Sequence, residues 1–146
     1  MQQTNNIATL LRQSTHLLTK SSTPRLDAEV ILASALKTNR TWLYANSDSI
    51  VSPEETAAYL VKVKERDKGV PVPYITGCCE FWSLPLTITP DVLIPRPETE
   101  LLVAMTLDII KRSPSRLSIA DLGTGSGAVA LAVASETDQA MIVATD

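Results

Sequence analysis

The feature that most constrains the fold is a run of three alternate glycines, Gly123, Gly125 and Gly127, between two apolar segments. Residues 117–120 precede it with the spacing of a strand, and residues 128–134 follow it as a small apolar run typical of a buried helix. Strand, glycine turn and helix together present backbone N–H groups and a helix N-terminus to a ligand. The sequence therefore predicts a ligand-binding turn here, and a plain turn without a ligand is the structural alternative.

Two classes of cofactor use such a turn. Gly123-x-Gly125-x-x-Ala128 fits the looser dinucleotide fingerprint, which favours NAD or FAD. Asp121 favours a ligand with a cationic ammonium group, such as S-adenosylmethionine, because its carboxylate would repel a pyrophosphate. Asp146 follows another apolar run and could accept hydrogen bonds from ribose hydroxyls in either class.

Charge and cysteine usage restrict the partners and the compartment. The net charge of −3 argues against a nucleic-acid binder that works by bulk charge. Cys78 and Cys79 are adjacent and cannot form an ordinary disulfide with each other, and no cluster of His and Cys suggests a metal site. The N-terminus lacks a signal-peptide pattern, and no apolar run reaches ~18 residues. We therefore expect a cytoplasmic protein without a membrane segment or a bound metal.

The chain is expected to have three parts. Residues 1–69 have helical periodicity, with a strong helix start at Ser52, where Pro53 and Glu55 complete a capping box. Residues 70–95 are expected to form a linker and a β-hairpin, because Gly69 to Pro73 disfavour helix and residues 84–89 alternate apolar and polar.

Residues 96–146 are expected to begin an α/β domain. A helix opens at Pro97, with a buried stripe at Leu102, Met105 and Ile109, and the glycine turn then joins two parallel strands. Two such strands leave much apolar surface bare, whereas parallel sheets are normally larger and covered on both faces. We therefore expect the chain to be the truncated front part of a longer domain.

The glycine turn and three other segments of the chain resemble the release-factor glutamine methyltransferases, the HemK or PrmC family. The run Ile-Pro-Arg-Pro-Glu-Thr-Glu at residues 94–100 is the most family-specific of them. The matching segments are residues 73–77, 80–86, 93–103 and 121–128.

The resemblance implies a fold of class α plus α/β: an N-terminal helical bundle that helps dock the protein substrate, a hairpin linker, and the first part of a Rossmann-like methyltransferase domain. It implies methyl transfer from S-adenosylmethionine to the glutamine amide nitrogen in the Gly-Gly-Gln motif of peptide chain release factors. It further implies a full-length protein that is a monomer, with no direct contact to nucleic acid.

The resemblance also assigns roles to individual residues. Gly123 to Gly127, including Thr124 and Ser126, would surround the methionyl and ribose groups, with Asp146 at the ribose and Asp121 at the ammonium. Arg96 and Glu98 would lie near the mouth of the cofactor and substrate site.

The family's Asn-Pro-Pro-Tyr motif does not occur in these 146 residues. In the family that motif binds the target amide. The amide nitrogen is a poor nucleophile, so its methylation depends on accurate positioning. We therefore expect no catalytic residue in this chain, no methyl transfer by it alone, and weak binding of S-adenosylmethionine. Two alternatives stay open: a non-catalytic module that docks a release factor or another partner, and a nicotinamide-dependent oxidoreductase.

Overall fold

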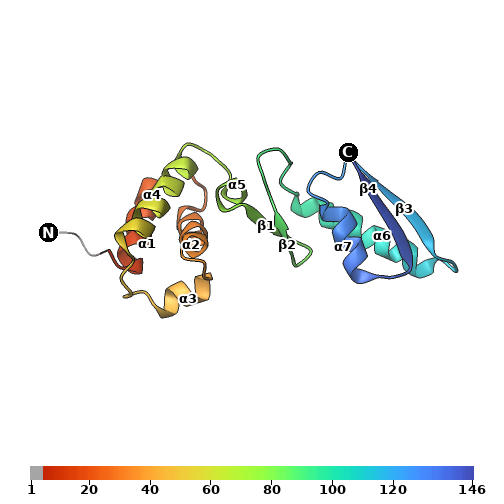
Figure 1. Ribbon diagram of the computed structural model, residues 1–146, viewed down its shortest axis with the longest axis horizontal. Helices are drawn as coiled ribbons and strands as arrows, with labels where there is room; N and C mark the ends of the chain where they lie inside the picture. Colours follow the sequence, from red (N-terminus) through yellow and green to blue (C-terminus); the bar gives the residue numbers. More distant parts are fainter. Residues whose placement is uncertain (1–4) are drawn as a thin grey trace. The chain divides into compact units, whose positions relative to one another are not determined.

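The computed structural model describes residues 5–146, which divide into two compact units between Thr76 and Gly77 (Figure 1). The first unit is helical, and the second combines helices with short strands, as the sequence predicts. The expected division into three parts, with boundaries at residues 69 and 95, stays a prediction, because it assigns a function to each part as well as its limits. The helices of the first unit are α1 (Ile7–Leu17), α2 (Pro24–Ala35), α3 (Arg40–Ala45), α4 (Pro53–Asp67) and α5 (Val72–Thr76).

Side-chain caps mark the starts of α1 and α4. Asn6 accepts a hydrogen bond from the Thr9 N–H at 2.9 Å at the start of α1. Ser52 and Glu55 form the predicted capping box at the start of α4, with Pro53 in the first turn. These contacts satisfy N–H groups that a helix cannot satisfy itself, and a good cap stabilises a helix by about 1 kcal/mol.

The core of the first unit lies between α1, α2 and α4. Tyr59 of α4 is fully buried in it, and its hydroxyl donates to the Ala28 carbonyl at 3.3 Å. Burial raises the pKa of Tyr59 to about 12, so the phenol stays neutral. The other buried apolar residues of this core are Ile7, Leu10, Leu11, Leu18, Ala28, Ile31, Leu32, Ala33, Leu43, Val51, Val63 and Ile75.

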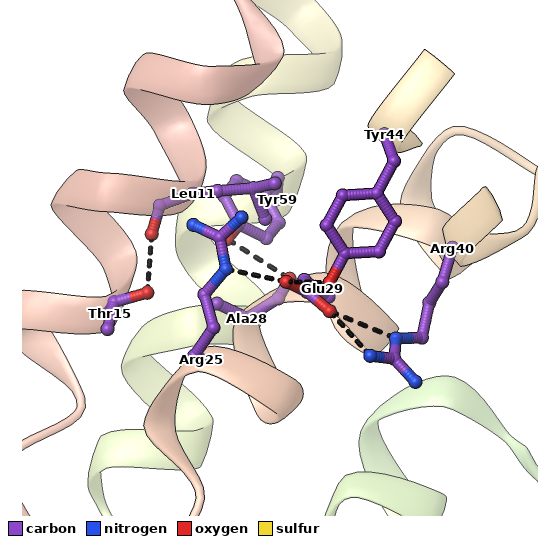
Figure 2. Close-up of polar contacts among 8 residues, drawn as sticks. All are labelled: Leu11, Thr15, Arg25, Ala28, Glu29, Arg40, Tyr44 and Tyr59. Atoms are coloured by element: carbon purple, nitrogen blue, oxygen red, sulfur yellow. Dashed lines mark hydrogen bonds and ion pairs between the residues drawn. The ribbon is translucent and has the colours of Figure 1, made fainter. Parts of the chain in front are cut away.

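Helix α2 buries two carboxylates, Asp27 and Glu29, which apolar periodicity did not indicate. Figure 2 shows Glu29 between Arg25, Arg40 and Tyr44. Arg25 Nε and the Tyr44 hydroxyl donate to Glu29 Oε1, and Arg40 donates to Oε2 through Nε at 3.0 Å and Nη2 at 2.8 Å. Burial alone would raise the pKa of Glu29, but the hydrogen bonds from Tyr44, Arg40 and Arg25 outweigh it and lower that pKa. The cluster therefore ties α3 to α2.

Asp27, two residues before Glu29 on α2, makes a similar contact with α4. Arg66 Nε donates to Asp27 Oδ2 at 2.6 Å, and Arg66 Nη1 donates to the Val70 carbonyl at 3.2 Å. Burial would raise the pKa of Asp27, but hydrogen bonds from Ser21, Arg66 and Thr23 lower it overall. Arg66 thus links α2 to the segment that follows α4.

That segment contains α5, although Gly69 to Pro73 were expected to be a linker. The side chain of Ile75 is buried in the core of the first unit. A proline disfavours the interior of a helix but is accepted in its first turn, which is where Pro73 lies.

The second unit contains β1 (Cys78–Phe81), β2 (Leu84–Thr87), the 3₁₀ turn η1 (Pro97–Thr99), α6 (Glu100–Arg112), β3 (Leu117–Leu122), α7 (Ala128–Glu136) and β4 (Ala140–Thr145). Strands β1 and β2 form the predicted antiparallel hairpin, with Phe81 opposite Leu84. Trp82 and Ser83 make its two-residue turn with φ values of +52° and +60°, which suits the right-handed twist of the strands. The Trp82 N–H donates to Glu100 Oε1 at 2.9 Å and its indole Nε1 to Glu136 Oε1 at 2.8 Å, so the hairpin is bonded to α6 and α7.

Strands β3 and β4 are parallel and are joined through α7, with Leu117 opposite Ala140 and Leu122 opposite Thr145. The predicted strand, glycine turn, helix and second strand are all present. The expected buried stripe of α6 is wrong, because Leu102, Met105 and Ile109 are each more than half exposed. The buried residues are Val103, Leu107 and Ile110 instead. Both sets are apolar at helical spacing, so periodicity alone could not choose between them.

Candidate functional site

The candidate site is the loop between β3 and α7. Gly123, Gly125 and Gly127 have φ values of +73°, +54° and +78°, in the left-handed region that side chains with a Cβ rarely adopt. A Cβ added at Gly123 or Gly125 would meet no heavy atom within 4 Å, so the backbone there is open to an approaching molecule. The glycines are thus required by the backbone conformation, and they leave space above the loop.

The end of β4 holds this loop in place. The N–H groups of Gly123 and Thr124 both donate to the Thr145 carbonyl, at 2.8 and 3.1 Å. The Gly125 N–H donates to Asp146 Oδ1 at 3.0 Å. The glycine loop and Asp146, which lie far apart in the sequence, therefore belong to one hydrogen-bonded assembly.

Asp121 contacts the same loop from the strand side. Its Oδ2 accepts hydrogen bonds from Thr124 Oγ1 at 2.8 Å and from the Ala130 N–H at 3.2 Å. Ala130 is the third residue of α7, whose cap residue, Gly127, has no side chain. Asp121 therefore supplies the acceptor that the start of α7 would otherwise lack.

The remaining predicted site residues are less closely joined to the loop. Ser126 lies within it and is half-buried. Arg96 and Glu98 are exposed at the start of η1, and neither side chain forms a hydrogen bond or ion pair with the loop among residues 5–146. The structure thus brings Asp121, Thr124, the glycines and Asp146 together. The roles that the family resemblance assigns to all these residues stay predictions.

The donor pattern of the loop distinguishes between the two ligand classes. Four of its five N–H groups donate to protein acceptors, namely those of Gly123, Thr124, Gly125 and Gly127. A phosphate cradle needs free N–H groups, and the Asp121 carboxylate beside the loop would repel an anion. Open backbone beside carboxylates suits a ligand that carries a cation and hydroxyl groups. The residues present therefore fit S-adenosylmethionine better than a dinucleotide.

Residues 5–146 bring together no group of three His, Cys, Asp or Glu side chains suited to a metal ion. None of their helices combines the length and the apolar character that crossing a membrane requires.

Comparison with known proteins adds to this geometry. The family model described as the PrmC N-terminal domain matches residues 9–77, which end one residue beyond the first structural unit. A release factor glutamine methyltransferase of Coxiella burnetii is 51% identical over 133 residues, covering 91% of this chain and 48% of the relative. The chain belongs to the release factor glutamine methyltransferase family, and it matches the N-terminal portion.

Other members of the family are similarly close. Proteins of the same name are 43% identical over 143 residues in Aliivibrio fischeri and 41% identical over 136 residues in Escherichia coli. They cover 97% and 93% of this chain, but 50% and 48% of their own length. The chain thus spans about half the length of the curated relatives that it matches.

Sequence reasoning missed several polar contacts of the two units. The bonds of Asp121 to Thr124 and Ala130 combine residues three and nine positions apart, and no periodicity indicates them. One signal was visible: a helix that begins after a glycine needs an acceptor from elsewhere, and Asp121 was the nearest acidic residue in sequence.

Proposed function

We propose that a protein containing this chain, together with the segment that corresponds to the remaining half of its relatives, methylates the glutamine amide nitrogen in the Gly-Gly-Gln motif of peptide chain release factors. S-adenosylmethionine would supply the methyl group as a sulfonium, a good electrophile. The observation that carries the proposal is the convergence of Asp121 and Asp146 on an open glycine loop.

In this proposal the second unit begins a Rossmann-like cofactor domain. Gly123 to Gly127 would bind the methionyl and ribose groups, Asp121 would face the ammonium and Asp146 the ribose hydroxyls. Arg96 and Glu98 would lie near the mouth of the site, where exposed charges can contact substrate. The helical unit would dock the release factor, and the protein would work as a monomer in the cytoplasm, where translation ends.

The chain itself would not catalyse the reaction. An amide nitrogen shares its lone pair with its carbonyl, so the enzyme must position it and hydrogen-bond its NH₂ group. The Asn-Pro-Pro-Tyr motif that performs this task in the family is absent from these 146 residues. We expect the chain alone to leave a release factor unmethylated.

Mass spectrometry of a release factor tests this proposal. The complete polypeptide, incubated with S-adenosylmethionine and the release factor, should add one methyl group to the peptide that contains Gly-Gly-Gln. A release factor in which that glutamine is replaced by asparagine is the control and should gain none. An unmodified glutamine after incubation with protein that binds S-adenosylmethionine would show that the substrate assignment is wrong.

The first unit's role needs a separate test. A polypeptide that lacks residues 1–69 should still bind S-adenosylmethionine but methylate the release factor with a much higher KM. Unchanged KM values would rule out docking by this unit. If the intact protein binds the release factor but never methylates it, the non-catalytic binding module is the better description.

A further inference from the structure

Thr124 is the most interconnected residue of the glycine loop. Its N–H donates to the Thr145 carbonyl, its own carbonyl accepts from the Gly127 N–H at 2.9 Å, and its hydroxyl donates to Asp121 Oδ2 at 2.8 Å. The side chain therefore points back to β3 and its hydroxyl hydrogen is used within the protein. This placement differs from that of a residue whose hydroxyl binds the cofactor directly.

The two carboxylate oxygens of Asp121 have different surroundings. Oδ2 accepts both from Thr124 Oγ1 and from the Ala130 N–H. Oδ1 has no hydrogen-bond partner within residues 5–146. Two donors on one oxygen fix the rotation of the carboxylate about its Cβ–Cγ bond, so Oδ1 is held in one direction rather than exchanged with Oδ2.

We propose that Thr124 is a positioning residue, which holds Asp121 so that Oδ1 is presented to the α-ammonium group of S-adenosylmethionine. The inference rests on the proposed function and deepens it, because it makes Thr124 the residue that selects for the amino-acid part of the cofactor. The Thr124 hydroxyl acts through Asp121, whereas the backbone of residues 123–127 would contact the cofactor. Removing this hydroxyl leaves Oδ2 with the Ala130 N–H alone, so the carboxylate is held less firmly in one orientation.

If Thr124 positions Asp121, removing its hydroxyl should lower the affinity for S-adenosylmethionine but not for a ligand that lacks the ammonium group. 5′-Methylthioadenosine contains the nucleoside and the methyl-bearing sulfur of the cofactor, as a neutral thioether in place of the sulfonium, but lacks the amino-acid group. Binding of S-adenosylmethionine should therefore depend on the Thr124 hydroxyl, whereas binding of 5′-methylthioadenosine should not. A hydrogen bond to a charged group is typically worth enough for a change of roughly 10-fold in affinity.

The test is calorimetric titration of both compounds into the complete polypeptide and its variants. Thr124→Val should weaken S-adenosylmethionine roughly 10-fold and 5′-methylthioadenosine less than about 2-fold. Thr124→Ser, which keeps the hydroxyl, should restore binding to near the unsubstituted value. Thr106→Val is the matched control, because the Thr106 hydroxyl donates only to the Leu102 carbonyl of its own helix, at 2.8 Å.

A second measurement needs no ligand. Amide hydrogen exchange at Ala130 should be faster in Asp121→Ala, which removes the acceptor, and only slightly faster in Thr124→Val. Equal acceleration in the two variants would show that Thr124 supports the loop as a whole, and would overturn the selective role.

The outcomes separate this inference from the proposed function. If the unsubstituted protein binds NAD but not S-adenosylmethionine, both are wrong. If it binds S-adenosylmethionine and Thr124→Val weakens both compounds equally, or neither, the proposed function stands and the positioning role of Thr124 is overturned. Selective weakening with rescue by serine supports the role.

Discussion

Replacing Glu29 with glutamine is expected to destabilise the helical unit by about 2 kcal/mol. The carboxylate accepts two hydrogen bonds on each oxygen, from Arg25 and Tyr44 on one and from Arg40 on the other. A glutamine amide keeps one acceptor oxygen, so it can retain one pair of bonds and loses the other. Each lost bond is worth about 1 kcal/mol, because both arginines are about half exposed and water can solvate their freed N–H groups.

Urea unfolding followed by tryptophan fluorescence measures this effect. The chain has two tryptophans, and Trp42 lies on α3, close in sequence to Arg40 and Tyr44. A Trp82→Phe background leaves Trp42 as the only indole, so the signal reports on the helical unit. Glu65→Gln is the matched control, because Glu65 is exposed on α4, and such a change should alter stability by less than about 0.5 kcal/mol.

The pH dependence of the difference in free energy of unfolding between the unsubstituted chain and Glu29→Gln gives the sharper test. Hydrogen bonds lower the folded-state pKa of Glu29 despite its burial. A carboxyl group with a lowered folded-state pKa stabilises the fold above its unfolded pKa, about 4.3 for glutamate, and that contribution is lost as the pH falls through the folded-state value. The difference in free energy of unfolding between the unsubstituted chain and Glu29→Gln should therefore become smaller under acid conditions. A gap that is constant from neutral to acid pH, or Glu29→Gln as stable as Glu65→Gln, would refute the reasoning.

Three further substitutions have expected outcomes. Arg66→Met removes the bonds to Asp27 and Val70 and should lower the free energy of unfolding by about 2 kcal/mol in the same urea assay; a change below about 0.5 kcal/mol would contradict it. Ser83→Gly relieves a left-handed residue in the hairpin turn and should raise the thermal midpoint of the second unit in calorimetry, whereas a lower midpoint would count against it. Gly125→Ala strains a backbone at φ +54° by about 1–2 kcal/mol and should weaken S-adenosylmethionine binding to the complete polypeptide, so unchanged affinity would argue that the loop does not contact the ligand.

Local signals made the helix starts and the glycine loop predictable from the sequence. Ser52, Pro53 and Glu55 specify a helix start within four residues, because a cap depends only on its own first turn. Alternate glycines likewise predict positive φ values, since few other residues adopt them. These features need no knowledge of the rest of the fold.

Contacts between distant residues were not predictable in the same way. Asp27 and Glu29 look exposed in a hydropathy pattern, yet both are buried because Arg66 and Arg40, 39 and 11 residues away, neutralise them. The i, i+4 pair of Arg25 and Glu29 was visible in the sequence, but it is equally typical of a solvated helix face.

Helix α6 illustrates a second limit. It is apolar on more than one side, so the choice of Val103 over Met105 for burial depends on which neighbours pack against it. In the candidate site, the convergence of an acid, three glycines and a second acid followed from the motif. The direction of the Thr124 hydroxyl did not, because a side-chain rotamer depends on the folded loop.

The most direct test is to titrate S-adenosylmethionine and NAD separately into the complete polypeptide, with Asp146→Asn as the comparison. Asp146 accepts from the N–H of Gly125, the middle residue of the loop, so we expect this substitution to change the affinity of a ligand that binds there. We predict that S-adenosylmethionine binds more tightly than NAD and that Asp146→Asn weakens it at least several-fold. Tighter binding of NAD, or affinity for S-adenosylmethionine that Asp146→Asn leaves unchanged, would contradict a methyl-donor site at this loop.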